Sequence, residues 1–98
     1  VTVGQNGSTF NPKIVMISVH DTVKWTWKGS GHNVVSGNNC VANNIFCSPN
    51  DQGCFQAPVS NVNTTYEHTF NTPGVYHYVC TEYCGLGHQY MFGTLTVE

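Results

Sequence analysis

The end of the sequence carries four side chains whose chemistry points to a soft metal ion. Within the stretch "CTEYCGLGHQYM", residues 80–91, Cys80, Cys84, His88 and Met91 follow the spacing Cys-x3-Cys-x3-His-x2-Met. Thiolate, imidazole and thioether ligands together favour copper over the hard cations that prefer oxygen ligands. We therefore predict a copper site on this stretch.

A further candidate ligand lies far upstream. His32 stands in "GSGHNVV", directly after a glycine-rich turn and at the start of a predicted strand, so it can face the same end of the fold as residues 80–91. A histidine at a strand end is by itself more often a packing or hydrogen-bonding residue, and His32 is predicted as a ligand only in combination with the loop. Four other residues of these types are predicted to lie on the surface or to pack in the core: Met16, His20, His68 and His77.

The segments that must position these ligands alternate between apolar and polar residues with a period of two, which is typical of half-buried strands. The predicted strands are residues 1–3, 13–19, 22–28, 32–36, 66–70, 75–79 and 92–97. No apolar pattern of helical period continues long enough for a long helix. The chain is predicted to be all-β, a Greek-key β-sandwich of seven or eight strands in which residues 1–98 form one domain. Trp25 and Trp27 are expected on opposite faces of their strand, one in the core and one partly exposed.

One stretch interrupts the strand pattern. Residues 37–63 are too many for a hairpin and too polar for a core segment, so we expect an irregular connection with at most one short strand or helical turn. It contains Cys40, Cys47 and Cys54. The turn-forming residues between Cys47 and Cys54 favour a disulfide between these two over one between Cys40 and Cys54.

The composition of the chain argues against some classes of function. The 98 residues include only three Lys or Arg and five Asp or Glu, so no basic surface exists for nucleic acid. No apolar run is long enough to cross a bilayer. Few charges and five cysteines in a small domain are typical of an extracytoplasmic setting, periplasmic or secreted. We expect a mature, monomeric chain whose precursor carries an export signal or a membrane anchor.

In its predicted ligands and strands, the chain resembles the cupredoxins. The body "STFNPKIVMISVHDTVKWTWKGSGHNVV" and the closing "NTPGVYHYVC" and "GTLTV" are similar to the plastocyanin-like single-domain cupredoxins. The loop of residues 80–91 is similar instead to the ligand loop of the binuclear CuA (purple copper) centre in cytochrome c oxidase subunit II, which carries two cysteines where blue copper loops carry one.

The resemblance implies a complete ligand set for two copper ions. Two thiolates bridge both coppers, and one imidazole and one weak ligand complete each copper. The implied ligands are the thiolates of Cys80 and Cys84, the imidazoles of His32 and His88, the thioether of Met91 beside His32, and the backbone carbonyl of Glu82 beside His88. Because such a set leaves no open coordination position for a substrate, we expect a one-electron carrier and not an enzyme.

The resemblance also implies a redox partner protein, such as a cytochrome or another cupredoxin. We expect this partner to approach the exposed edge of His88 and the neighbouring apolar residues Leu86 and Tyr90.

Two alternatives to the binuclear carrier stay open from the sequence. The first is a mononuclear type 1 copper carrier, which uses His32, Cys80, His88 and Met91 and leaves Cys84 idle. The second is a copper delivery or storage protein, which needs exposed and exchangeable ligands. The number of coppers bound per chain separates the first alternative from the binuclear centre.

Overall fold

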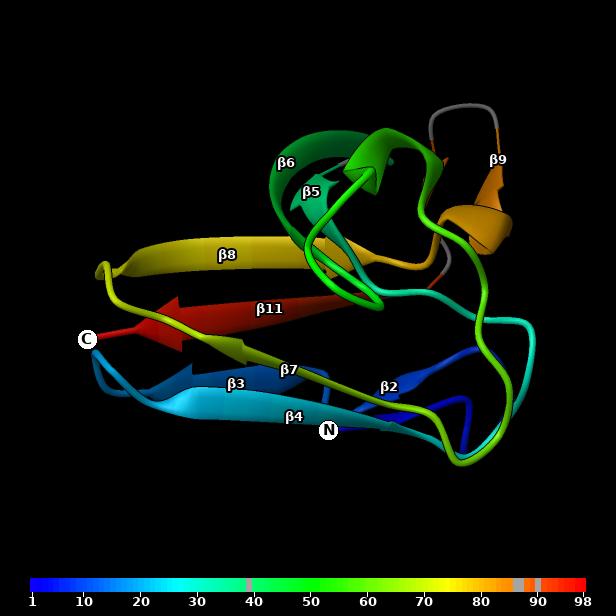
Figure 1. The fold of residues 1–98 in the computed structure, drawn as a ribbon, viewed down its shortest axis with the longest axis horizontal. Coiled ribbons are helices and arrows are strands. Elements are labelled where there is room, and N and C mark those ends of the chain that lie inside the picture. The colour runs from blue at the N-terminus through cyan, green and yellow to red at the C-terminus, as the bar shows by residue number, and fades with distance from the viewer. Residues whose placement is uncertain (39, 86–87, 90) are drawn as a thin grey trace.

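The protein is a sandwich of two mixed β-sheets. This is seen in a computed structural model, which describes residues 1–38, 40–85, 88–89 and 91–98 (Figure 1). In sheet order, the four-stranded sheet contains β2 (Phe10–Asn11), β1 (Thr2–Val3), β4 (Thr22–Trp27) and β7 (Thr65–Thr69). The five-stranded sheet contains β3 (Ile14–Ile17), β11 (Phe92–Val97), β8 (Gly74–Val79), β5 (Val35–Asn38) and β6 (Val41–Cys47). The remaining described elements are the ribbon of β9 (Cys84–Gly85) and β10 (His88–Gln89) and the 3-10 turns η1 (Cys54–Gln56) and η2 (Thr81–Tyr83).

The predicted all-β, Greek-key sandwich is confirmed, with nine strands in the two main sheets and no α-helix among the described residues. None of the helical turns in this part of the chain is long and apolar enough to span a bilayer. The largest difference from the prediction is β6, a seven-residue strand inside the stretch that we expected to be mostly irregular. β6 is an edge strand with only Phe46 and Cys47 buried, so its sequence lacks a clear alternating pattern.

Aromatic side chains form much of the core between the two sheets. The positions of two of them correct an expectation from the sequence. Trp25 and Trp27 are both fully buried. Residues two positions apart on a strand lie on the same face, so the expectation that they point to opposite faces was wrong. The Trp25 ring stacks on Tyr66 and Phe46, with centroid distances of 5.2 and 5.7 Å. These contacts tie β4, β6 and β7 together across the sandwich.

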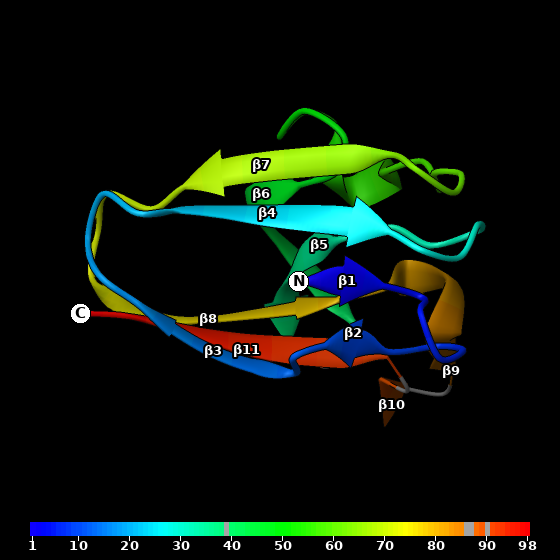
Figure 2. The same ribbon diagram turned by 90° about the horizontal axis from the view of Figure 1, so that it is seen from below.

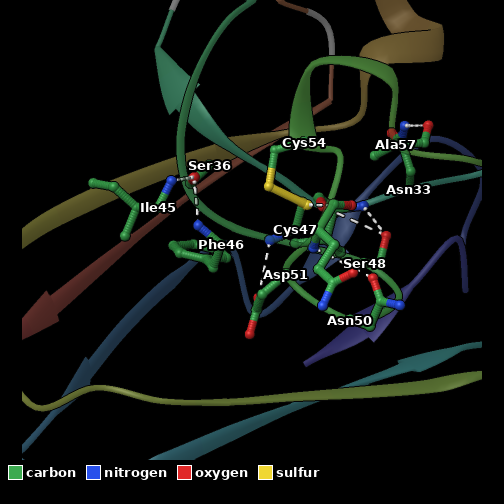
Figure 3. The surroundings of a disulfide bond; sticks show 12 residues. Asn33, Ser36, Ile45, Phe46, Cys47, Ser48, Asn50, Asp51, Cys54 and Ala57 are labelled. Carbon is green, nitrogen blue, oxygen red and sulfur yellow. Dashed lines mark hydrogen bonds between the residues drawn. A yellow bond between two sulfur atoms is a disulfide. The ribbon is translucent and has the colours of Figure 1, made fainter.

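A disulfide between Cys47 and Cys54 closes a turn within the long connection, as predicted from the turn-forming residues between them (Figure 3). Asp51 organises this turn. Its carboxylate accepts a hydrogen bond from the Cys47 N–H at 3.1 Å, and its own N–H donates to the Cys47 carbonyl at 2.8 Å. The Asp51 carboxylate also accepts the hydroxyl of Tyr66 on β7 and lies 3.0 Å from the Nδ1 atom of His68.

The strands deliver the candidate ligands to one end of the molecule. The chain that follows β4 and the chain that follows β8 both emerge at the end of the sandwich opposite the C-terminus (Figures 1 and 2). His32 lies on the first of these segments and Cys80 on the second. The sheet topology therefore brings together two residues that are 48 positions apart in the sequence.

Candidate metal centre

His32 is held between two glycine-containing turns and the core. It forms an isolated bridge with Ser60, in which the Ser60 N–H donates to the His32 carbonyl at 2.9 Å. The same carbonyl accepts the indole N–H of Trp27 at 2.8 Å. The side chain packs against Gly4, where a Cβ atom would lie 2.6 Å from the imidazole Cδ2 atom. With 5% of its surface exposed, His32 is fixed from the backbone side and from the ring side.

Cys80 meets His32 inside the protein. Its Sγ atom lies 3.9 Å from Nδ1 of His32 and accepts a hydrogen bond from the backbone N–H of Asn33 at 3.5 Å. The backbone N–H of Cys80 donates to the carbonyl of Met91 at 3.0 Å, which sets Met91 beside Cys80 at the ends of β8 and β11. Cys80 and Met91 are 0% and 1% exposed. Two of the predicted ligands, His32 and Cys80, thus meet inside the protein, and a third, Met91, is buried and bonded to Cys80 through its backbone.

Asn33 links the segment that carries His32 to the segment that carries Cys80, and its role was not predicted from the sequence. Its side-chain amide N–H groups donate to the carbonyl of Ala57 at 3.0 Å and to the hydroxyl of Thr81 at 2.7 Å. Its side-chain oxygen accepts the backbone N–H of Thr81 at 2.9 Å. Asn33 is fully buried, and its position directly after His32 was the only sequence signal that could have identified it.

Cys84 was predicted to bind copper through its thiolate, but its sulfur lies in a disulfide. It forms a disulfide with Cys40, which stands in the turn between β5 and β6, while Cys80 is in neither disulfide. This pairing was not among those predicted from the sequence. A sulfur in a disulfide has no thiolate to offer a metal, so a ligand role for Cys84 requires that the bond to Cys40 be reduced first. The role of Cys84 as a ligand stays a prediction.

The other predicted ligands are described to different extents. Glu82 lies in η2 with an exposed side chain, as expected for a residue that contributes only its backbone carbonyl. The backbone of His88 belongs to β10, paired with Gly85 of β9, but its side chain lies outside the described part of the structure. Leu86 and Tyr90, the expected partner-facing residues, also lie outside the described residues. Their roles stay predictions.

The electrostatics of the gathered residues suit a soft metal ion. Burial lowers the pKa of His32, so its imidazole is neutral and offers a lone pair at neutral pH. Within the described residues, no three His, Cys, Asp or Glu side chains are grouped closely enough to hold a metal ion, and the site is built on the contact between His32 and Cys80. Imidazole, thiol and thioether, buried together, are the donor set that copper prefers. The residues therefore fit a copper ion.

Comparisons with known proteins point the same way. A model of the family "Copper binding proteins, plastocyanin/azurin family" matches residues 1–98. Halocyanin from Natronomonas pharaonis is 36% identical over an alignment of 98 residues that covers 97% of this chain and 52% of halocyanin, so the chain spans about half the length of that relative. Cytochrome c oxidase subunit 2 from Thermus thermophilus is 54% identical over 35 residues, which are 36% of this chain and 26% of the subunit. A reduced Cu(I) form of an amicyanin variant superposes with a TM-score of 0.69 at 26% identity, covering 100% of this chain and 81% of amicyanin.

Proposed function

The chain belongs to the plastocyanin/azurin family of copper binding proteins, and from this membership we propose that it carries single electrons through a binuclear CuA centre. The observation that carries the proposal is the buried contact between the Cys80 sulfur and the His32 Nδ1 atom, 3.9 Å apart and supplied by segments distant in sequence. Copper supplies the one-electron redox couple when bound. The protein holds two of the proposed ligands, His32 and Cys80, in contact with each other.

The chain's own residues perform three tasks in this role. The hydrogen bonds from Trp27 and Ser60 fix the backbone carbonyl of His32, and Gly4 packs against its ring, so this ligand has little room to move. The Asn33 N–H stabilises the charge on the Cys80 sulfur. Burial of the sulfur excludes water and competing reactions. A centre closed in this way favours electron transfer over bond chemistry or rapid metal release.

The binuclear form of the centre rests on Cys84. In this proposal Cys80, Cys84, His32 and His88 would hold two coppers, with Met91 as a weak ligand beside His32. The carbonyl of Glu82 is the weak ligand beside His88. The Cys-x3-Cys-x3-His-x2-Met spacing and the 54% identity to cytochrome c oxidase subunit 2 over 35 residues support this assignment.

A mononuclear type 1 centre is the second candidate, and one observation favours it. The disulfide between Cys40 and Cys84 leaves Cys80 as the cysteine that is in neither disulfide. His32, Cys80, His88 and Met91 then form a set for one copper. Both candidates carry one electron at the same end of the sandwich.

We place this electron transfer outside the cytoplasm, with a cytochrome or another cupredoxin as the redox partner. The two disulfides support the location, because structural disulfides persist in oxidising compartments.

The ratio of copper to protein, measured together with the electron paramagnetic resonance spectrum, tests the proposal. After reduction of the Cys40–Cys84 disulfide, we expect two coppers per chain and a seven-line hyperfine pattern, because the unpaired electron is shared between two copper nuclei. The variant Cys84→Ser is expected to bind one copper and to give a four-line pattern.

Matched histidine variants separate the site from general effects. His32→Gln is expected to abolish stable copper binding, whereas His20→Gln, at an exposed position, is expected to leave it unchanged. One copper and four lines in the fully reduced chain would refute the binuclear centre and support the mononuclear one. Equal copper binding by the two histidine variants would refute both.

A further inference from the structure

The Cys40–Cys84 disulfide links the turn between β5 and β6 to the predicted ligand loop. Its two cysteines are 44 positions apart in the sequence, and both are only partly buried. The second disulfide is in a different environment, because Cys47 and Cys54 are 0% and 1% exposed. Thiol–disulfide exchange requires access of the attacking thiolate to a sulfur. A dithiol in solution therefore reaches the Cys40–Cys84 bond more readily than the Cys47–Cys54 bond.

The same sulfur of Cys84 has two possible partners. As a bridging ligand it must be a thiolate, and as half of a disulfide it has no ionisable thiol. Cys80, in contrast, is held inside the protein by the Asn33 N–H and faces His32. The disulfide therefore removes one predicted ligand while the His32 and Cys80 pair stays assembled. Oxidation of Cys84 is compatible with one copper but not with two.

We propose that the Cys40–Cys84 disulfide is a redox switch that sets how many coppers the chain binds, one when it is oxidised and two when it is reduced. This inference rests on the proposed binuclear function, and it assigns Cys40 the role of controlling access to the second copper. The contrast between the accessible bond and the buried Cys47–Cys54 bond makes the switch selective.

The chemical step needs a dithiol as reductant. A thiolate of the dithiol attacks one sulfur of the Cys40–Cys84 bond, that bond breaks, and a mixed disulfide forms while the second cysteine sulfur leaves and takes up a proton. The second thiol of the reductant then displaces the remaining cysteine as its thiol. Two electrons and two protons pass to the protein, and the reductant leaves as a disulfide. Cys84 loses its proton again when it binds copper.

The experiment compares the full chain before and after mild treatment with dithiothreitol, which is removed under anaerobic conditions before copper is added. Alkylation in denaturant, which exposes the buried Cys80, followed by mass spectrometry counts and locates the thiols. We expect Cys80 alone to be alkylated before treatment, and Cys40, Cys80 and Cys84 after it, with the Cys47–Cys54 bond intact. The copper-to-protein ratio is expected to double, from one to two, and the hyperfine pattern to change from four lines to seven.

Two variants isolate the role of Cys40. Cys40→Ser leaves Cys84 without its disulfide partner and is expected to bind two coppers with no reductant. The double variant Cys47→Ser with Cys54→Ser removes the other disulfide and is expected to bind one copper until dithiothreitol is added. Should a variant not fold, the untreated and treated wild-type chains still provide the comparison.

The outcomes distinguish the switch from the proposed function. Two coppers in a chain whose Cys40–Cys84 bond is shown to be intact by peptide mapping would overturn the switch, and so would alkylation of Cys40 before treatment. Alkylation of Cys40 before treatment would leave the binuclear centre standing, whereas two coppers beside an intact Cys40–Cys84 bond would also refute the role of Cys84 as a ligand. One copper in both the treated wild type and Cys40→Ser would refute the binuclear centre itself.

Discussion

Replacing Asn33 with alanine is expected to destabilise the copper-free protein by about 3 kcal/mol, because three side-chain hydrogen bonds of about 1 kcal/mol each are lost. These bonds link Asn33 to Ala57 at 3.0 Å and, twice, to Thr81 at 2.7 and 2.9 Å. The substitution also removes contacts at a fully buried position. In a domain of this size, 1 kcal/mol corresponds to roughly 4–8 °C in Tm, so we expect Tm to fall by roughly 15 °C.

Thermal and urea unfolding, followed by circular dichroism and by the fluorescence of the buried tryptophans, measure this loss. Asn61→Ala is the matched control, because it makes the same chemical change at an exposed position. We expect the control to change the free energy of unfolding by less than about 0.5 kcal/mol. A loss below about 1 kcal/mol for Asn33→Ala, or one equal to that of the control, would refute the assignment of Asn33 as the link between the segments that carry His32 and Cys80.

The copper-loaded variant provides a second and independent result. Alanine keeps the backbone N–H that donates to the Cys80 sulfur, but it loses the bonds that hold Thr81, the residue after Cys80. We therefore expect a shifted thiolate-to-copper absorption band and faster loss of copper to a chelator. A large loss of stability with an unchanged absorption band and unchanged copper retention would mean that Asn33 supports the fold and does not position the ligand.

The other predictions concern a tyrosine pair and one glycine. Burial raises the pKa of Tyr78 to about 12 from its ordinary value of 10.0, so the folded chain binds this proton more tightly than the unfolded chain. The free energy of unfolding should therefore fall by about 3 kcal/mol as the pH rises from 10 to 12. The Tyr78 hydroxyl completes no hydrogen bond within the described residues, so Tyr78→Phe should be nearly neutral at pH 7 and should flatten this alkaline loss in urea unfolding. Tyr66→Phe removes a hydrogen bond to the Asp51 carboxylate and should lower the free energy of unfolding by about 2 kcal/mol at pH 7. Equal effects of Tyr66→Phe and Tyr78→Phe on stability at pH 7 would contradict this expected difference. Gly4→Ala places a Cβ atom 2.6 Å from the ring of His32 and should weaken copper binding, whereas Gly7→Ala, also at positive φ but with nothing within 4 Å, should not; equal copper affinities would refute a clamp on His32.

Much of the fold of this protein could be predicted from short stretches of its sequence. Alternation with a period of two follows from strand geometry, so the sandwich could be predicted from residue types alone. The Cys47–Cys54 disulfide could be predicted because both cysteines flank one short turn, and closure of a short loop depends mainly on nearby residues. The one clear error in a strand, the placement of Trp25 and Trp27, came from misapplying the alternation, since residues two apart share a face.

The sequence by itself determined which atoms are available for a metal: imidazole, thiol and thioether groups at a spacing that suits copper. Only the tertiary structure decided which of them meet. Asn33 acquires its role because β4 and β8 end at the same side of the sandwich, which places Thr81 within hydrogen-bond distance. The Cys40–Cys84 disulfide joins the turn between β5 and β6 to β9, 44 positions away in the sequence, and such a contact depends on the packed fold and not on the residues around either cysteine. The chemical groups available to a metal follow from the residue types, whereas contacts between segments distant in sequence depend on how the whole chain packs.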